Sequence, residues 1–175
     1  MTSIRKIFKN ATAAQTAVRD VLTIVFSAEL LAPSRDVFIV APWISNIVVF
    51  DNRLGQYDSL NPEWGKREIR LIDVVVALSS SGTSVHIHTR PETHNRPFER
   101  KLREALEDAG VADKCIWAQH AHLHTKGLLT DRMLIDGSMN LTERGVGLND
   151  ETVNVCFDST DIASARIHFD SYDNN

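Results

Sequence analysis

Residues 124–140 read HTKGLLTDRMLIDGSMN, and this stretch decides the fold. Its two halves carry apolar residues in alternation with polar ones, and a polar turn around Asp131 separates them. Side chains alternate between the two faces of a β-strand. The pattern therefore predicts a hairpin of two strands, His124–Thr130 and Met133–Gly137.

The predicted turn fixes which side chains meet across this hairpin. A three-residue loop places Lys126 opposite Ser138. It also places His124 opposite Asn140, so that four polar side chains converge on one face.

The same register sends the apolar side chains to the other face of the hairpin. Leu129 and Ile135 are then expected to lie together, facing a core. A two-residue turn would shift the register by one position and move every side chain to the opposite face. The register is thus an expectation that the structure tests directly.

An imidazole, an ammonium, a hydroxyl and a carboxamide at one place suit a phosphate group. Lys126 is expected to neutralise a non-bridging oxygen, while Ser138 and Asn140 supply directed hydrogen bonds. His124 can attack phosphorus or carry a proton near neutral pH. Glu151 is a candidate to hold the second ring nitrogen of His124, as carboxylates orient histidine in other sites.

The spacing of these residues resembles the signature of the phospholipase D superfamily. His124, Lys126 and Asp131 match its HxKxxxxD motif. A GSxN element follows at the spacing that the family shows, and further matches stand downstream. The matching positions after Asp131 are Gly137, Ser138, Asn140, Asn149 and Glu151.

The resemblance implies a metal-independent phosphodiesterase with a phosphohistidine intermediate and no cofactor. One motif histidine is the nucleophile, and a second motif copy supplies the acid that protonates the leaving oxygen. The chain carries one copy of the motif, so a homodimer is implied. The resemblance gives the matching aspartate, Asp131, a supporting role within the catalytic set. His122 is a further candidate to line the phosphate pocket.

Other segments resemble the phospholipase D-like proteins of bacterial gene clusters that insert 7-deazapurines into DNA and restrict unmodified DNA. They are residues 41–45 (APWIS), 64–70 (WGKREIR) and 89–91 (TRP). This resemblance implies DNA as the substrate, a role in restriction or phage defence, and other subunits of a restriction system as partners.

The whole chain, residues 1–175, is expected to form one α/β domain of the phospholipase D-like fold. Helices and strands alternate over its first two thirds, which predicts a mixed, mostly parallel sheet with helices on both faces. Expected helices cover residues 13–31, 68–78, 97–109 and 161–169; expected strands cover 37–40, 84–89, 115–118, 124–130, 133–137 and 152–157. The polar stretch Asp51–Lys66 is either a functional loop or an insertion.

Composition is that of an ordinary soluble protein, with 43% hydrophobic and 24% charged residues. A net charge of −4 argues against strong non-specific binding of nucleic acid by the whole surface. Cys115 and Cys156 fit no zinc spacing and are expected to be reduced, buried thiols. The sequence shows no signal peptide and no membrane anchor, so a cytoplasmic location is the default expectation.

Histidines at positions 120, 122 and 124, and again at 86 and 88, alternate along predicted strands. A metal site is one interpretation. No cysteine or aspartate completes a tetrahedral set of ligands, so a metal site is not expected. The basic cluster Arg96, Arg100, Lys101 and Arg103 is better explained by ion pairs along a solvated helix face than by contacts to a phosphate backbone.

Three aromatic residues, Trp43, Tyr57 and Trp64, flank the polar stretch. Aromatic side chains can stack on bases. Packing against the core is the stronger expectation for Trp43, and the two interpretations are equally good for Tyr57 and Trp64.

Three functions stay open at this level. The first is a nuclease or related phosphodiesterase that acts on DNA. The second is a phospholipid phosphodiesterase, against which the lack of a basic amphipathic segment counts. The third is a non-catalytic or partner-dependent DNA-binding subunit, which the acidic net charge favours and the intact motif disfavours.

Overall fold

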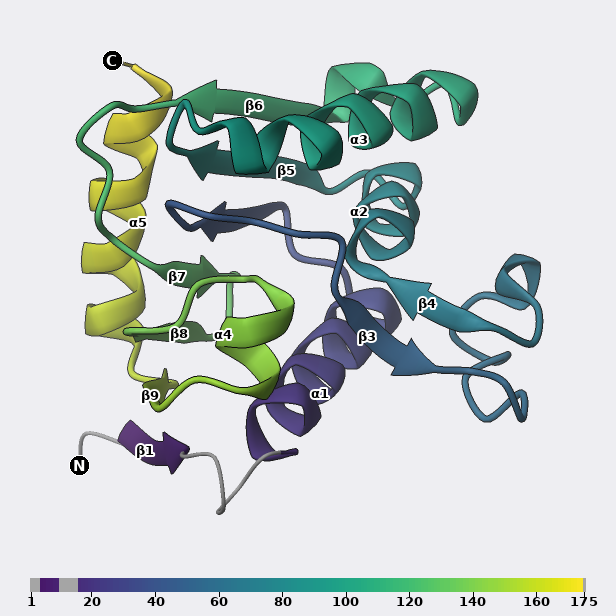
Figure 1. Ribbon diagram of the computed structural model, residues 1–175, viewed down its shortest axis with the longest axis horizontal. Helices are drawn as coiled ribbons and strands as arrows, with labels where there is room; N and C mark the ends of the chain where they lie inside the picture. The colour runs from purple at the N-terminus through teal and green to yellow at the C-terminus, as the bar shows by residue number, and fades with distance from the viewer. Residues whose placement is uncertain (1–3, 10–15, 175) are drawn as a thin grey trace.

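A computed structural model describes residues 4–9 and 16–174 of the protein (Figure 1). The strands of its main sheet are β1 (Ile4–Lys9), β2 (Asp36–Val40), β5 (Ser84–Thr89), β6 (Cys115–Gln119), β7 (Gly127–Leu129), β8 (Leu134–Gly137) and β9 (Glu151–Cys156). Their order across this sheet is β1-β9-β8-β7-β2-β5-β6. A second sheet contains β3 (Val48–Asp51) and β4 (Glu68–Arg70).

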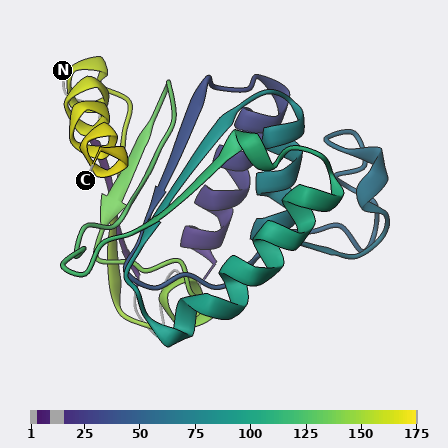
Figure 2. The ribbon, with the colours of Figure 1, turned by 90° about the horizontal axis from the view of Figure 1, so that it is seen from above.

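Helices cover both faces of the main sheet. They are α1 (Ala17–Leu31), α2 (Leu71–Ser80), α3 (Arg96–Asp108), α4 (Glu143–Gly147) and α5 (Ser159–Asp173), with short 3-10 turns η1 (Pro62–Trp64), η2 (Thr93–Asn95) and η3 (Ala112–Lys114). Figure 2 shows α5 on one face of the sheet and α1, α2 and α3 on the other. No helix in the described ranges is long and apolar enough to span a membrane.

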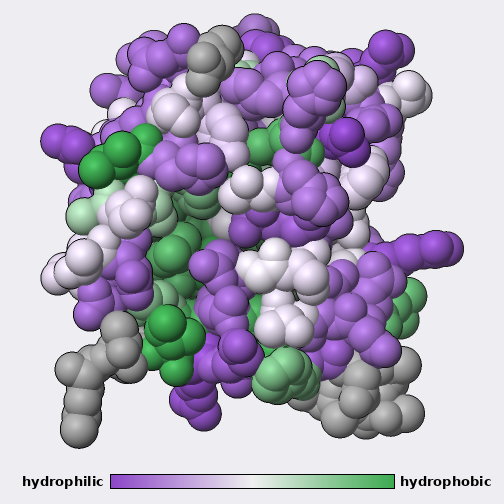
Figure 3. Space-filling view, turned by 90° about the vertical axis from the view of Figure 1, so that its left-hand side faces the viewer, coloured by the Kyte–Doolittle hydropathy of each residue, from purple (hydrophilic) through white to green (hydrophobic). Residues whose placement is uncertain are grey.

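Alternation along the central strands divides the core into two parts. On β2, Val37 and Ile39 face the cluster under α1, α2 and α3, whereas Phe38 faces the cluster under α5. All three side chains are at most 1% exposed. The side that carries α5 is mostly hydrophilic at its surface (Figure 3).

The expected fold class is confirmed, because a large mixed sheet is flanked by helices on both faces. Among the described strands of the main sheet, β2 pairs in parallel with β5 and β5 pairs in parallel with β6. The pairs β1–β9, β8–β9, β7–β8 and β2–β7 are antiparallel. The parallel share is therefore smaller than expected, because the last third of the chain adds its strands as antiparallel neighbours.

Most expected elements appear near their expected bounds, with a few differences. The first helix begins at Ala17, and the expected start at 13–15 lies outside the described residues. Glu68–Arg70 is strand β4 and not the start of the next helix, because these residues pair with β3. Strand β1 was not expected, and it places Lys9 opposite Glu151 on β9.

The polar stretch Asp51–Lys66 forms the loop between β3 and β4 together with η1. Trp64 is 6% exposed and Tyr57 is half-buried, and both rings pack against Phe50 with centroid distances of 5.5 and 4.9 Å. Core packing, not base stacking, thus accounts for these two aromatic residues.

Both cysteines are free thiols: Cys156 is buried and Cys115 is half-buried. Burial raises the pKa of Cys115 to about 12, so this thiol stays protonated and unreactive at neutral pH. On α3, Arg100 pairs with Glu104 at 3.1 Å and Arg103 pairs with Glu99 at 2.9 Å. These i,i+4 pairs agree with a solvated helix face.

Candidate active site

An open cleft of about 560 Å³ lies where β7 begins and β8 ends. Its walls contain four polar side chains that the motif singled out, namely His124, Lys126, Ser138 and Asn140. Trp43, Thr125, Asp136 and Gly137 complete the lining. The volume suits a small phosphodiester or one nucleotide unit of a polymer.

The register expected for the hairpin is wrong by one residue. Leu129 lies opposite Leu134, and Thr130 donates its backbone N–H to the carbonyl of Met133 at 2.9 Å. The turn therefore contains two residues, Asp131 and Arg132. As a result Leu129 and Ile135 do not share a face: Leu129 packs in the cluster under α5 and Ile135 in the cluster under α1.

The polar side chains still converge because the strands end before they reach the cleft. Strand β7 begins at Gly127, so His124 and Lys126 stand on the loop before it. Strand β8 ends at Gly137, whose φ of +145° turns the chain just ahead of Ser138. A Cβ at Gly137 would lie 2.0 Å from the carbonyl oxygen of Thr152, so glycine is required there.

Glu151 contacts Ser138 and not His124, which differs from the expected pairing. The Ser138 hydroxyl donates to Glu151 Oε2 and accepts from the backbone N–H of Thr152 at 3.0 Å. Asn149 Nδ2 donates to the other Glu151 oxygen at 3.4 Å. The His124 ring is exposed and makes no hydrogen bond within the described part of the chain, so both nitrogens are accessible to a substrate.

Lys126 brings positive charge to the cleft and is half-buried. Its Nζ donates to the His124 carbonyl oxygen at 2.6 Å. Burial lowers the pKa of Lys126, the charge of Glu151 opposes this change, and the charge of Arg90 adds to it. Arg90, which sequence reasoning did not assign to the site, thus acts electrostatically on Lys126 from the loop after β5.

Trp43 is the second residue that sequence reasoning did not place here. It is half-buried and lines the cleft, so core packing alone does not describe it. Its backbone N–H donates to Asn140 Oδ1 at 3.3 Å, and the Arg90 guanidinium lies 5.9 Å from its ring centroid. The Asn140 amide is thereby oriented with its NH₂ group free to donate to a ligand.

Buried Asn95 ties together the segments that carry these two residues. Its Oδ1 accepts from the backbone N–H of Ile44 at 2.9 Å. Its Nδ2 donates to the carbonyl oxygens of Pro42 and Arg90, each at 2.9 Å. The segments 41–45 and 89–91 noted in the sequence are therefore joined at one wall of the cleft.

Asp131 lies in the hairpin turn and takes a structural position. Its carboxylate accepts from the Arg35 backbone N–H at 2.8 Å and from Arg166 Nη2 of α5 at 2.7 Å. It does not line the cleft. His122 is exposed and does not line the cleft either, so the expected contribution of His122 to the phosphate pocket is not seen.

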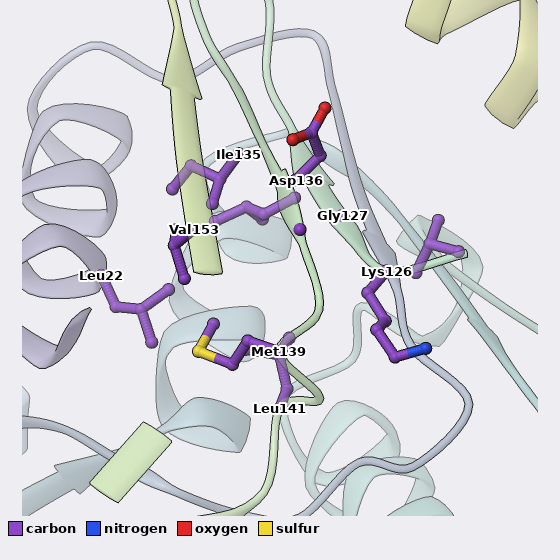
Figure 4. Close-up of a pocket in the computed structure, with 11 residues that line it drawn as sticks. Leu22, Lys126, Gly127, Ile135, Asp136, Met139, Leu141 and Val153 are labelled. Carbon is purple, nitrogen blue, oxygen red and sulfur yellow. The ribbon is translucent and has the colours of Figure 1, made fainter. Parts of the chain in front are cut away.

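A small apolar void of about 20 Å³ lies directly behind the cleft (Figure 4). In this view Leu22, Met139 and Val153 point toward one another, while the amine of Lys126 points away from them. The void has room for about one water molecule and few polar partners, so it backs the site and does not receive substrate.

Comparison with known proteins supports the fold and the family. The family described as "Cardiolipin synthase, PLD-like domain" (PLD, phospholipase D) matches residues 59–172, more than half of the chain. No curated protein matches the sequence. Among solved structures, NucT from Helicobacter pylori is similar at a TM-score of 0.62 and 14% identity, over 97% of this chain and 96% of that one.

Two further structures share the fold. The phospholipase D family member Nuc from Salmonella typhimurium has a TM-score of 0.61 and 15% identity, over 99% of this chain and 95% of that one. TrmBL2, an archaeal chromatin protein whose structure is described as showing a novel mode of DNA binding, has a TM-score of 0.55 and 13% identity. That match covers 97% of this chain and 51% of TrmBL2.

Proposed function

This chain belongs to the family of phospholipase D-like domains, and from that premise we propose that it is a phosphodiesterase that cleaves DNA through His124. The observation that carries the proposal is the cleft. It gathers a free imidazole, an ammonium and a carboxamide donor on one open surface, as attack on a phosphodiester requires.

In the proposed reaction a ring nitrogen of His124 attacks phosphorus and forms an N–P bond while the P–O bond to the leaving alcohol breaks. Lys126 and the Asn140 amide hold the non-bridging oxygens as charge moves onto them. Water then attacks the phosphohistidine, the N–P bond breaks, and a phosphate monoester leaves with His124 restored.

Proton transfer in both steps requires a second group. Among the described residues of the cleft, His124 is the one histidine, and the Asp136 carboxylate accepts from Asn154 Nδ2 at 2.6 Å. Glu151 is held by Ser138 and Asn149. We infer that His124 of a second copy protonates the leaving oxygen and later takes the proton of water. The active unit would then be a homodimer with two motifs meeting across a two-fold axis.

The test is cleavage of bis-p-nitrophenyl phosphate and of plasmid DNA in EDTA. Wild type should be active, and His124→Ala should lose at least about 10³-fold in rate. The matched control is His122→Ala, which removes a nearby exposed imidazole outside the cleft and should retain activity. Equal activity of His124→Ala and wild type would contradict the assignment of His124.

We further propose a role in DNA restriction or phage defence, together with partner subunits. It rests on the segments 41–45 and 89–91, which Asn95 joins at the wall of the cleft. The same plasmid prepared with and without 7-deazaguanine bases tests it. Preferential cleavage of unmodified DNA is expected, and equal cleavage of both would remove modification sensing from the proposal.

A non-catalytic, DNA-binding subunit is the second candidate. Its specific support is the fold similarity to TrmBL2, a chromatin protein, and the net charge of −4, which favours contacts made through a partner. DNA binding by a folded protein that turns over neither substrate, alone or with partners, would favour this candidate.

A further inference from the structure

Two histidines and an aspartate meet on the face of the sheet opposite α2 and α3. Alternation along β5 turns Val85 and Ile87 toward those helices and His86 and His88 toward α5. His88 is 0% exposed and His86 is 9% exposed. Asp173, in the last turn of α5, reaches over both rings, and Figure 1 shows this end of α5 beside the ends of β5 and β6.

The three side chains point their ligand atoms at one spot. Asp173 Oδ2 lies 2.7 Å from His86 Nδ1, and Asp173 Oδ1 lies 3.3 Å from His88 Nε2. All the ligand atoms lie within 4.8 Å of one another. Zinc binds imidazole and carboxylate at about 2.0–2.2 Å, which places neighbouring ligands of a tetrahedral ion about 3.3 Å apart.

One of these atoms is not satisfied by the protein. His88 Nε2 is buried and has no hydrogen-bond partner, although a carboxylate oxygen stands 3.3 Å away. A buried polar atom without a hydrogen-bond partner destabilises the folded state. A cation between His88 Nε2 and Asp173 would satisfy both groups.

Among the described residues, His88 has an outward hydrogen-bond partner for its other nitrogen, whereas the other nitrogen of His86 has none. His86 Nε2 lies 3.6 Å from Asp36 Oδ1, and His88 Nδ1 lies 3.2 Å from His120 Nε2. Metal-bound histidines almost always donate their second ring N–H to a carboxylate or another acceptor, which fixes the tautomer. The arrangement around His88 follows this rule, whereas the Asp36 carboxylate lies too far from His86 Nε2 for a hydrogen bond.

We propose that His86, His88 and Asp173 bind a Zn²⁺ ion, with water as the fourth ligand. Two imidazoles and one carboxylate suit zinc better than the all-oxygen preference of Mg²⁺ or Ca²⁺. This site lies apart from the cleft and does not depend on the proposed function.

The ion would fasten the end of α5 to the centre of the sheet. Tyr172 precedes Asp173 and donates its hydroxyl to Thr125 Oγ1 at 3.0 Å. Thr125 stands between His124 and Lys126, so the same helical turn supports the loop that carries both. Zinc would therefore stabilise the fold and hold this loop.

The experiment is metal binding by tag-free protein that has been dialysed against EDTA and then freed of chelator. Titration with ZnCl₂ against a chromophoric chelator should show one tightly bound Zn²⁺ per chain. Zinc should also shift thermal unfolding to higher temperature. Co²⁺ in place of Zn²⁺ should give the visible absorption of a tetrahedral nitrogen–oxygen site. Absence of a tight equivalent in wild type would overturn the proposal.

Variants locate the ion. Asp173→Asn keeps the shape of a partly exposed side chain and should weaken zinc binding about 100-fold or more. Asp170→Asn, one turn earlier on the exposed side of α5, should bind as wild type. Unchanged zinc binding by Asp173→Asn would place the ion elsewhere and overturn the assignment. Loss of the tightly bound zinc in His124→Ala would do the same.

Discussion

Gly137 determines where the hydroxyl of Ser138 lies. Because its φ is +145° and a Cβ would meet the Thr152 carbonyl at 2.0 Å, Gly137→Ala must push β8 away from β9 or change the backbone. We expect a loss of about 3 kcal/mol or more in the free energy of unfolding, measured by urea denaturation.

The control for this change is Gly147→Ala in α4, where a Cβ meets no atom within 4 Å. Alanine favours helix over glycine, so this variant should be as stable as wild type or slightly more so. Similar destabilisation by both substitutions would mean that the close contact with Thr152 does not constrain residue 137.

Lys126 gives the second prediction at the scale of single residues. Burial lowers its pKa below the ordinary 10.5, so the ammonium loses its proton as pH rises through a value below 10.5. The rate of phosphodiester cleavage should therefore fall on the alkaline side before pH 10.5. Lys126→Arg keeps a charge that does not titrate in this range, so its alkaline limb should move to higher pH.

If the pH profiles of wild type and Lys126→Arg are identical, the titration of Lys126 does not cause the alkaline limb. The maximal rate of Lys126→Arg is not the readout, because a guanidinium differs from an ammonium in shape. The position of the limb is the readout.

Single positions of the site were predictable because the motif fixes residue types at fixed spacing. His124, Lys126, Ser138 and Asn140 do line one cleft. The register of the hairpin was not predictable, because it depends on the number of residues in the turn and the motif does not determine that number. Trp43 and Arg90 were not assigned to the cleft because they lie on loops distant in sequence, and the resemblance of segments 41–45 and 89–91 gives neither side chain a role.

At the scale of elements, long-range contacts decide the length of the hairpin turn. Glu29, fully buried on α1, accepts from Arg132 at 2.7 Å. On the other side, Asp131 accepts from Arg35 and Arg166. Partners so distant in sequence leave no local signal, which is why a two-residue turn could not be read from residues 124–140.

The Asp131–Arg166 pair joins the turn to α5 and gives the prediction for this scale. Asp131→Asn should lower the free energy of unfolding by about 1–2 kcal/mol. A double-mutant cycle with Arg166→Met should show a coupling energy of about 0.5–1 kcal/mol. Since Asp131 stands outside the cleft, kcat for the folded variant should stay near wild type. A large loss of kcat without a loss of stability would give Asp131 a direct catalytic role.

The regular alternation of apolar and polar residues made most strands predictable, and the exceptions have physical reasons. Strand β4 has three residues, too few for a periodic pattern, and its pairing with β3 overrides the helical pattern that begins at residue 68. Helix α5 runs from Ser159 to Asp173, past the expected end at 169. That extra turn carries Tyr172 and Asp173, so no sequence pattern connects Asp173 with the histidines of β5.

At the scale of the whole molecule, the open cleft with its single histidine leads to the last prediction. If each catalytic site needs His124 from two copies, a dimer of one wild-type and one His124→Ala chain contains no complete site. Equal amounts of the two proteins, unfolded and refolded together, assort at random, so about a quarter of the dimers are fully wild type. Activity per total protein should then be about a quarter of that of wild type, and sedimentation should show a dimer.

Independent sites give a different number in the same experiment. If each chain acts alone, the refolded mixture retains about half of the wild-type activity, as does a mixture that is combined without unfolding and measured before subunits exchange. Refolding with His122→Ala in place of His124→Ala should leave activity near wild type. A value of one half after refolding, or a monomer in sedimentation, would require the second proton-transfer group to lie within one chain. Asp136, which lines the cleft, and Glu151, once released by Ser138, are then the candidates.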